Sequence, residues 1–312
     1  MGTTWSVRLV PVPGQERDLY QAAIEDELAG LITLFSHWDP TSELSRFNAA
    51  EPGFRPVSEE FWTVLNAAMD IADDTNGAVD PTLGALVDLW GFGPPGARPL
   101  NSFGNGPTEP FAEEIAAARA ISGWSRLRLD RANRSVLQLG GLKLDLSGIA
   151  KGHAVDCVSD RLFELGATSH LVEIGGELRG RGVKPDARPW WTELQQAPGS
   201  PAPRTLAALF EMAVATSGDW VRNYAVYDRT YSHTIDGRTG APIDNGVACV
   251  TVLADTALQA DALATALTVM GPEEGLEFAT ATHLAAAIVV RRQDGLVETV
   301  SPAFAAMLDE GS

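Results

Sequence analysis

The segment Asp145-Leu146-Ser147-Gly148-Ile149-Ala150-Lys151-Gly152 leads from a short strand into a helix. The helix is expected to end at Gly166, and its apolar residues follow helical spacing: Val155, Val158, Leu162 and Leu165. Its N-terminus suits an anion, because free N–H groups and the helix dipole both favour negative charge there. The Gly-x-x-x-x-Gly-Lys-Ser/Thr spacing of a P-loop is absent, so an ordinary strand-to-helix turn remains an alternative.

Regions on either side of this segment alternate between strand-like and helix-like patterns. Trp5, Val7 and Leu9 alternate with polar residues, which predicts a half-buried strand. Apolar residues at helical spacing predict helices around residues 24–35 and 61–72, the second with Ser58 as its N-cap. Further predicted elements are a hairpin of 136–139 with 142–146 around Gly140-Gly141, a strand at 247–253, a helix at about 256–270, and a hairpin of 288–291 with 296–300.

The order of these elements predicts an α+β fold. Strands and helices are mixed without the regular rhythm of a doubly wound sheet, so we expect mixed or antiparallel sheets with packed helices. Two segments rich in Gly and Pro, residues 91–110 and 184–204, are predicted to be loops. The sequence has no internal repeat and no clear linker, so we predict a single domain over residues 1–312.

The charge balance makes some classes of binding partner unfavourable. Lys and Arg number 23 against 41 Asp and Glu, which leaves a net charge of −18 over 312 residues. An acidic surface of this size repels nucleic acid and anionic lipid, so we expect neither as a main partner. A substrate that carries phosphate would need local positive charge, and a bound metal ion is the obvious source.

Cysteine usage and the N-terminus bear on the compartment. Cys157 and Cys249 are too few for a disulfide framework or a structural zinc site, and they are expected as small apolar residues in a reducing compartment. The first residues lack the basic and apolar regions of a signal peptide, and no run approaches the ~18 apolar residues of a membrane span. We therefore expect a cytoplasmic protein, exported only if a leader has been removed.

Several polar clusters stand where predicted elements end. They are residues 76–82, Ile174-Gly175-Gly176-Glu177, Ser217-Gly218-Asp219, residues 231–236 around His233, and the pair Asp261 and Thr265. The last two side chains, four apart on a predicted helix, face the same way and offer oxygen ligands of the kind that Mg²⁺ takes. Each cluster also has a structural explanation: a turn, a buried histidine, or a helix start with a threonine bonded back to the backbone.

In their residues and in their order along the chain, these segments resemble the ApbE-like family of FAD:protein FMN transferases. The resemblance runs almost the whole length of the chain. It includes Ser42-Glu43-Leu44-Ser45-Arg46-Phe47-Asn48, Gly77-Ala78-Val79-Asp80-Pro81-Thr82, residues 145–152, Gly175-Gly176-Glu177, Ser217-Gly218-Asp219, Ser232-His233-Thr234-Ile235-Asp236 and Ala260-Asp261-Ala262-Leu263-Ala264-Thr265. The family implies an α+β, T-fold-like architecture with an FAD cleft, and transfer of FMN from FAD to a Ser or Thr of an acceptor flavoprotein, with release of AMP.

The resemblance also implies roles for single residues. Mg²⁺ would be held by the backbone carbonyl of Gly148 and the side chains of Asp261 and Thr265. His233 stands where the family has the histidine needed for transfer. FAD, the substrate, would contact Met1, Trp38, Ala78, Val79, Asp80, Asp145, Lys151, Glu177 and Ile235.

Two departures from the family pattern and two competing functions remain. Gly237 replaces the proline common after the Ile-Asp pair, and the segment 184–204 fits the family poorly. The same site with water in place of the acceptor hydroxyl would hydrolyse FAD to FMN and AMP. A non-catalytic FAD-binding protein is the other alternative, although such a protein needs neither the metal side chains nor the histidine.

Overall fold

The computed structural model describes residues 2–94, 98, 107–200, 204–226 and 229–308. Contacts group the chain into two compact units. Unit 1 consists of Met1–Leu31, Ile149–Gly218 and Asn245–Ser312, and unit 2 of Ile32–Gly148 and Asp219–Asp244. The single domain over 1–312 stays a prediction. In the part of the chain that the structure describes, we find no helix both long and apolar enough for a transmembrane span.

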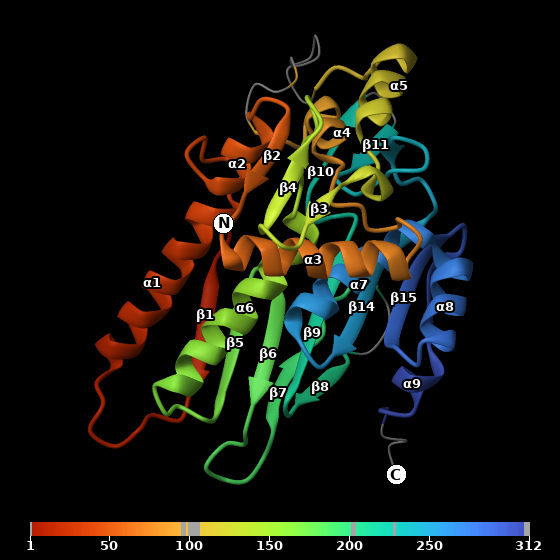
Figure 1. Ribbon diagram of the computed structural model, residues 1–312. Coiled ribbons are helices and arrows are strands. Elements are labelled where there is room, and N and C mark those ends of the chain that lie inside the picture. The colour runs from red at the N-terminus through yellow and green to blue at the C-terminus, as the bar shows by residue number, and fades with distance from the viewer. Residues whose placement is uncertain (1, 95–97, 99–106, 201–203, 227–228, 309–312) are drawn as a thin grey trace. The chain divides into compact units, whose positions relative to one another are not determined.

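Unit 1 is built on a seven-stranded antiparallel sheet (Figure 1). In order across the sheet, its strands are β1 (Trp5–Leu9), β5 (His170–Ile174), β6 (Glu177–Arg181), β9 (Met212–Gly218), β14 (Val247–Ala254), β15 (Ala285–Arg292) and β16 (Gly295–Val300). The apolar, β-branched sequence of β14 is buried along almost its whole length, as expected for a central strand. The predicted strands at 5–9 and 247–253 and the hairpin of β15 with β16 are confirmed.

Helices complete unit 1. The helix α7 (Ala257–Met270) packs on β9 and β14, and its alanines form a closely packed core with the sheet and α8 (Pro272–Ala281). The helix α6 (Ser147–Glu164) carries Val155, Val158 and Leu162, all fully buried, and the chain turns at Gly166 with φ +87°. Other elements of the unit are α1 (Arg17–Phe35), whose last turn belongs to unit 2, the pair β7 (Trp190–Glu193) with β8 (Leu206–Leu209), and α9 (Pro302–Ala305).

Unit 2 combines short helices with small sheets. The longest helix, α3 (Glu59–Asp74), begins at Ser58, whose side chain accepts a hydrogen bond from Phe61 N, as predicted. The other helices of unit 2 are α2 (Glu43–Asn48), α4 (Gly84–Leu89), α5 (Ala112–Ile121) and the 3-10 turn η1 (Trp124–Arg126). One sheet consists of β2 (Gly53–Pro56), β4 (Ser135–Gln138) and β3 (Leu129–Asp130). Two further pairs of strands are β10 (Asn223–Val226) with β11 (Arg229–Ser232) and β12 (Ile235–Asp236) with β13 (Ala241–Pro242). A core of Leu83, Leu86, Trp90, Phe92, Val226, Tyr231 and Ile235 joins α4 with β10, β11 and β12.

The structure differs from the sequence-based expectation in two places. The hairpin of 136–139 with 142–146 is wrong, because both edges of β4 are taken by β2 and β3. After Gly140-Gly141 the chain instead forms one parallel bridge, between Lys143 and Leu83. The segment 184–204 is interrupted by β7. Much of the predicted loop 91–110 lies outside the described residues.

We expect the stability of unit 1 to depend on pH through the buried histidine His170. Its Nδ1 lies 2.7 Å from the carbonyl of Ala167 and its Nε2 lies 2.7 Å from Ser159 Oγ, so a neutral ring donates to the first and accepts from the second. Burial lowers the pKa of His170, and the charges of Arg181 and Arg179 lower it further.

The folded state therefore favours neutral His170, so this stabilisation is present above the unfolded pKa of ~6.5 and is lost as pH falls below it. Urea unfolding at several values of pH between 8 and 5 should show a larger loss of stability for the unaltered chain than for His170→Gln. An equal loss in both proteins would contradict this assignment.

Candidate functional site

Three charged side chains meet in unit 1. Lys151 from α6 forms an ion pair with Glu177 Oε1 at the start of β6, and its Nζ lies 3.5 Å from Asp261 Oδ1 on α7. Glu177 is 2% exposed and Asp261 3% exposed. Two buried carboxylates thus share one ammonium group, an arrangement that needs a compensating ligand or proton.

The electrostatics of this cluster follow from burial. Burial, and then repulsion from Asp261, raises the pKa of Glu177 to about 7, although Lys151 opposes the change. Burial lowers the pKa of Lys151, but the attraction of Asp261 and Glu177 outweighs it, so this pKa is raised. Lys151 therefore stays positive at neutral pH, and the raised pKa of Glu177 brings the change of its charge into the neutral range.

Oxygen donors suitable for a hard cation lie beside this cluster. Thr265 follows Asp261 by one turn of α7, and its Oγ1 lies 3.2 Å from Ser217 Oγ at the end of β9. The Oε2 atom of Glu177 is buried, and none of the described residues donates a hydrogen bond to it. Carboxylate and hydroxyl oxygens with an unused buried acceptor form a donor set that fits Mg²⁺.

Gly152 allows α6 and α7 to approach closely. A Cβ atom at this position would lie 2.1 Å from the backbone oxygen of Ala257, which cannot move aside as a flexible side chain would. The Gly152 N–H donates to Asp261 Oδ2 at 2.9 Å, so the same close approach holds the carboxylate.

We expect Gly152→Ala to separate the two helices and lower the free energy of unfolding by about 1–3 kcal/mol. The matched control is Gly30→Ala on α1, where a Cβ meets no atom within 4 Å. That change should stabilise the chain by roughly 0.5–1 kcal/mol, since alanine favours a helix over glycine. Chemical unfolding of both variants tests the pair, and a stable Gly152→Ala would contradict the close approach.

In unit 2, Arg222 joins the predicted residues Trp38 and His233. Its guanidinium lies 5.2 Å from the centre of the Trp38 ring, which is 47% exposed, and 5.8 Å from that of Phe92. Burial lowers the pKa of Arg222, while the nearby carboxylate of Asp145 raises it. The Nδ1 atom of His233 lies 3.0 Å from the carbonyl of Arg222, so Nδ1 donates and the ring's lone pair lies on Nε2.

The other predicted contacts of unit 2 are already engaged within the protein. Asp80 accepts hydrogen bonds from the backbone N–H and hydroxyl of Thr82 and from the backbone N–H of Trp124, and burial raises its pKa despite them. Ala78, Val79 and Ile235 are buried. The turn at 78–80 therefore offers a ligand its backbone more than its side chains.

The structure sorts the predicted residues into two groups. Lys151, Glu177, Asp261 and Thr265 come together in unit 1. In unit 2, Arg222 links Trp38, His233 and Asp145, whose Oδ1 accepts from Ser147 N at 2.8 Å. Met1 lies outside the described residues, and Gly148 lies in the first turn of α6.

Two site residues were not assigned from the sequence. Ser217 belongs to the quoted Ser217-Gly218-Asp219 cluster, whose position at a strand end was the available signal. Arg222 follows three residues later and had no signal, because its contacts with Trp38 and Phe92 join distant parts of the chain.

Comparisons with known proteins agree over nearly the whole chain. The model of the ApbE family matches residues 1–289. An FAD:protein FMN transferase of Vibrio cholerae is 39% identical, with 99% of this chain and 91% of that protein covered, and one from Escherichia coli (strain K12) is 31% identical, with 99% and 87% covered. The crystal structure of Pseudomonas stutzeri flavinyl transferase ApbE in its apo form superimposes with a TM-score of 0.88 at 37% identity, covering 100% of this chain and 95% of that one. The flavin transferase ApbE from Vibrio cholerae gives 0.88 at 38% identity, with 99% and 96% covered.

Proposed function

Since this chain belongs to the ApbE family, we infer that it is an enzyme that transfers the FMN part of FAD to an acceptor protein. In this reaction the oxygen of an acceptor hydroxyl bonds to the FMN phosphorus as the pyrophosphate bond of FAD breaks. AMP leaves with the bridging oxygen, and the hydroxyl proton passes to a base. Phosphoryl transfer of this kind depends mainly on positioning and charge, which the cluster around Lys151 is suited to provide.

The observation that carries this function is the pairing of Lys151 with two buried acids beside the hydroxyls of Thr265 and Ser217. We propose that Asp261 and Thr265 hold Mg²⁺ with the backbone carbonyl of Gly148, and that the hydroxyl of Ser217 supports Thr265. A bound Mg²⁺ polarises phosphoryl oxygens and stabilises the charge that moves to the leaving phosphate. Lys151 and Glu177 would then contact FAD near its phosphates.

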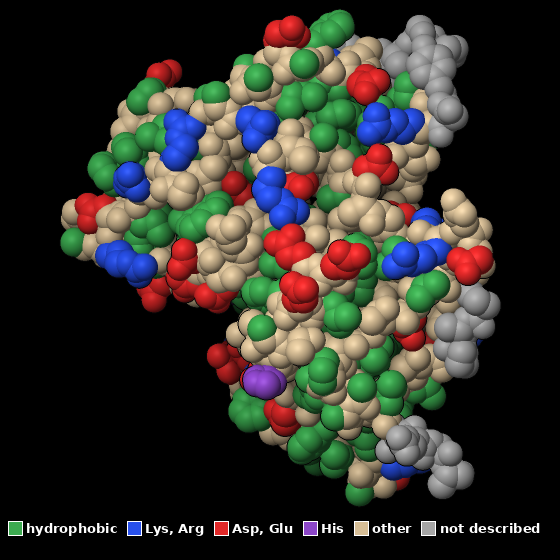
Figure 2. All heavy atoms as spheres, turned by 90° about the vertical axis from the view of Figure 1, so that its right-hand side faces the viewer, with side chains coloured by type: hydrophobic (Ala, Val, Ile, Leu, Met, Phe, Trp, Pro, Cys, Tyr) green, Lys and Arg blue, Asp and Glu red, His purple; other side chains and the backbone are tan. Residues whose placement is uncertain are grey.

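This assignment resolves the conflict between an acidic protein and a phosphate substrate. On the face shown in Figure 2, Lys and Arg side chains stand among Asp and Glu side chains rather than in a separate basic area. With a net charge of −18, the protein needs local positive charge to attract the pyrophosphate, and the ammonium of Lys151, whose pKa is raised, supplies it in unit 1.

The remaining roles are proposed for residues of unit 2. Trp38 offers an exposed aromatic face for the flavin, and Asp145 and the backbone of Ala78, Val79, Asp80 and Ile235 complete the contacts. His233 is fixed by its Nδ1 bond to Arg222, so its Nε2 side is the one suited to take the proton of the acceptor hydroxyl. A Ser or Thr side chain is the expected acceptor.

One incubation tests the proposal. The purified chain is mixed with FAD and Mg²⁺, with and without a flavoprotein acceptor that carries a candidate Ser or Thr. AMP is quantified and the acceptor is weighed by mass spectrometry. AMP release matched by addition of one FMN to the acceptor is expected. AMP release that does not depend on the acceptor would instead indicate an FAD hydrolase, and FAD binding without AMP would indicate a carrier.

A further inference from the structure

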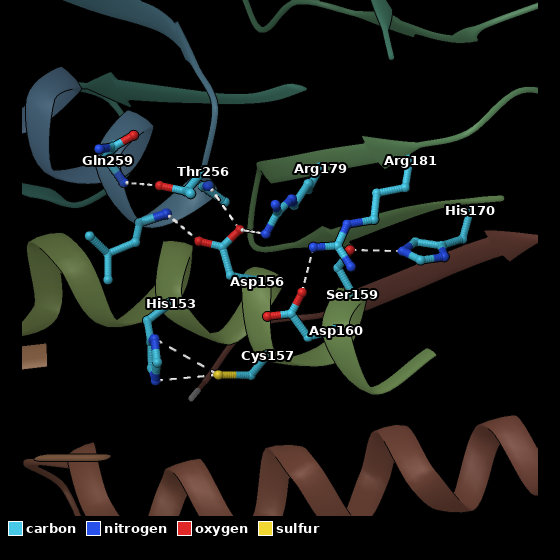
Figure 3. A network of polar contacts seen from close by, with 12 residues as sticks. His153, Asp156, Cys157, Ser159, Asp160, His170, Arg179, Arg181, Thr256 and Gln259 are labelled. Carbon is cyan, nitrogen blue, oxygen red and sulfur yellow. Dashed lines mark hydrogen bonds and ion pairs between the residues drawn. The ribbon is translucent and has the colours of Figure 1, made fainter. Parts of the chain in front are cut away.

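Alternate residues of β6 form ion pairs with successive turns of α6. Figure 3 shows two of these pairs, Asp156 with Arg179 and Asp160 with Arg181. The third is the pair of Lys151 with Glu177. We call these three ion pairs the ladder: Lys151–Glu177, Asp156–Arg179 at 2.6 Å and Asp160–Arg181 at 2.5 Å.

The geometry of strand and helix makes these pairs match. Residues two apart on a strand share one face and are separated by roughly 6.8 Å. Residues four or five apart on a helix are separated by roughly 6–7.5 Å along its axis. Because the two spacings agree, the three pairs fix the position of α6 along β6.

Asp156 differs from the other members of the ladder because it also contacts α7. Its Oδ1 accepts from Ala257 N at 3.0 Å and its Oδ2 accepts from Leu258 N at 2.9 Å. These are the first two amides of α7, and Asp156 itself is only 8% exposed. A buried carboxylate at a helix start interacts favourably with both the N–H groups and the helix dipole.

The start of α7 does not need Asp156 for its own cap. Thr256, the N-cap residue, already accepts from Gln259 N at 3.2 Å. The bonds to Asp156 therefore act between elements, and they have a counterpart one turn further along. There Asp261 of α7 accepts from Gly152 N of α6, so each helix provides an aspartate to the backbone of the other.

We propose that Asp156, held by Arg179, is a positioning residue that fixes α7 against α6 and thereby sets Asp261 and Thr265 relative to Lys151. Ala257, Asp261 and Thr265 lie on one face of α7 at intervals of four residues. A shift of the first turn of α7 thus displaces both side chains proposed to bind the metal, Asp261 and Thr265, together. The inference rests on the proposed function, because it concerns the binding of Mg²⁺ and FAD by that same cluster.

The test compares Asp156→Asn with Asp160→Asn. The first keeps the shape of the side chain but removes its charge and one of its two acceptor atoms. The second breaks an exposed pair of the same ladder without touching α7; the Asp160 side chain is 58% exposed. FAD binding is followed by flavin fluorescence in a Mg²⁺ titration without acceptor, and amide hydrogen exchange is measured over residues 256–265.

For Asp156→Asn, the Mg²⁺ concentration at half-maximal FAD binding should rise about 10- to 100-fold, as is usual when a group that orients metal ligands is changed. Exchange should become faster in the first turns of α7. For Asp160→Asn, both quantities should stay within about twofold of the unaltered chain, because exposed ion pairs contribute little. Arg179→Gln, which leaves the bonds of Asp156 to α7 possible, should give a smaller shift in the same direction, and it serves as the second test if Asp156→Asn does not fold.

Two results would overturn this inference while leaving the proposed function intact. One is a normal Mg²⁺ dependence in Asp156→Asn together with a lowered melting temperature, which would make Asp156 merely structural. The other is an equal shift in Asp160→Asn. Absence of Mg²⁺-dependent FAD binding in the unaltered chain would overturn the proposed metal site and this inference together.

Discussion

Asp261→Ala is expected to reduce FMN transfer by more than about a hundredfold, the upper end of the loss seen when a group that only supports a metal ligand is removed. Asp261 is the charged side chain among the proposed metal ligands, and it also accepts from Gly152 and lies beside Lys151. Its removal leaves the donor set with hydroxyl and carbonyl oxygens, which bind Mg²⁺ weakly. Single-turnover measurements over a range of Mg²⁺ concentrations give the size of the loss.

A second variant separates charge from structure at this position. Asp261→Asn keeps an oxygen that accepts from the Gly152 amide, so the contact between α6 and α7 should survive. The negative charge is lost, and transfer should therefore fall nearly as far as in Asp261→Ala, while the melting temperature changes less. Near-normal Mg²⁺-dependent turnover in either variant would show that the metal is held elsewhere.

His233→Ala is expected to lower the rate constant of transfer by ~10²–10⁴, the usual contribution of a general base. FAD and Mg²⁺ binding should stay close to that of the unaltered chain, because an interaction made only in the transition state affects rate more than affinity. The bond from Nδ1 to the Arg222 carbonyl orients the ring, whose centre also lies 6.4 Å from that of the Phe92 ring in an edge-to-face contact. Single-turnover rate, FAD affinity and melting temperature are measured on one preparation.

The control is His283→Asn. His283 is an exposed histidine with φ 55°, a backbone conformation that asparagine tolerates well. This variant should transfer FMN at the normal rate. If His233→Ala melts early but keeps the normal rate, His233 belongs to the scaffold and another group takes the proton.

Local patterns in the sequence predicted those elements whose spacing and end signals are strong. The helix α3 has six buried residues at helical spacing and a serine cap, and β15 with β16 has a tight turn of Gln293 and Asp294, after which Gly295 pairs with Arg292. Both are confirmed. The hairpin after β4 was wrong although its turn signal was equally clear, because strands from residues 53–56 and 129–130 occupy the edges of β4.

For the site as well, local patterns could be seen in the sequence and contacts between distant residues could not. Asp261 and Thr265 lie four residues apart, so their common face was visible in the sequence. The role of Gly152 was not, because it depends on the backbone of Ala257, about a hundred residues later. Nor was the contact of Arg222 with Trp38, since a cation over an aromatic ring has no sequence spacing. Predictions drawn from residues near in sequence are therefore more complete than those that depend on tertiary contacts.

The division of the chain into five stretches has a consequence for synthesis on the ribosome. The last residue of unit 2 is Asp244, and strand β14 of unit 1 begins only after it, at Val247. When unit 2 has been translated in full, the sheet of unit 1 still lacks three strands, and α7 with both proposed metal side chains has not been made. Pairings over such long separations form slowly, since a large loop must close before they contribute. The nascent chain therefore gains the two side chains proposed to hold Mg²⁺ only after the histidine proposed for transfer has been made.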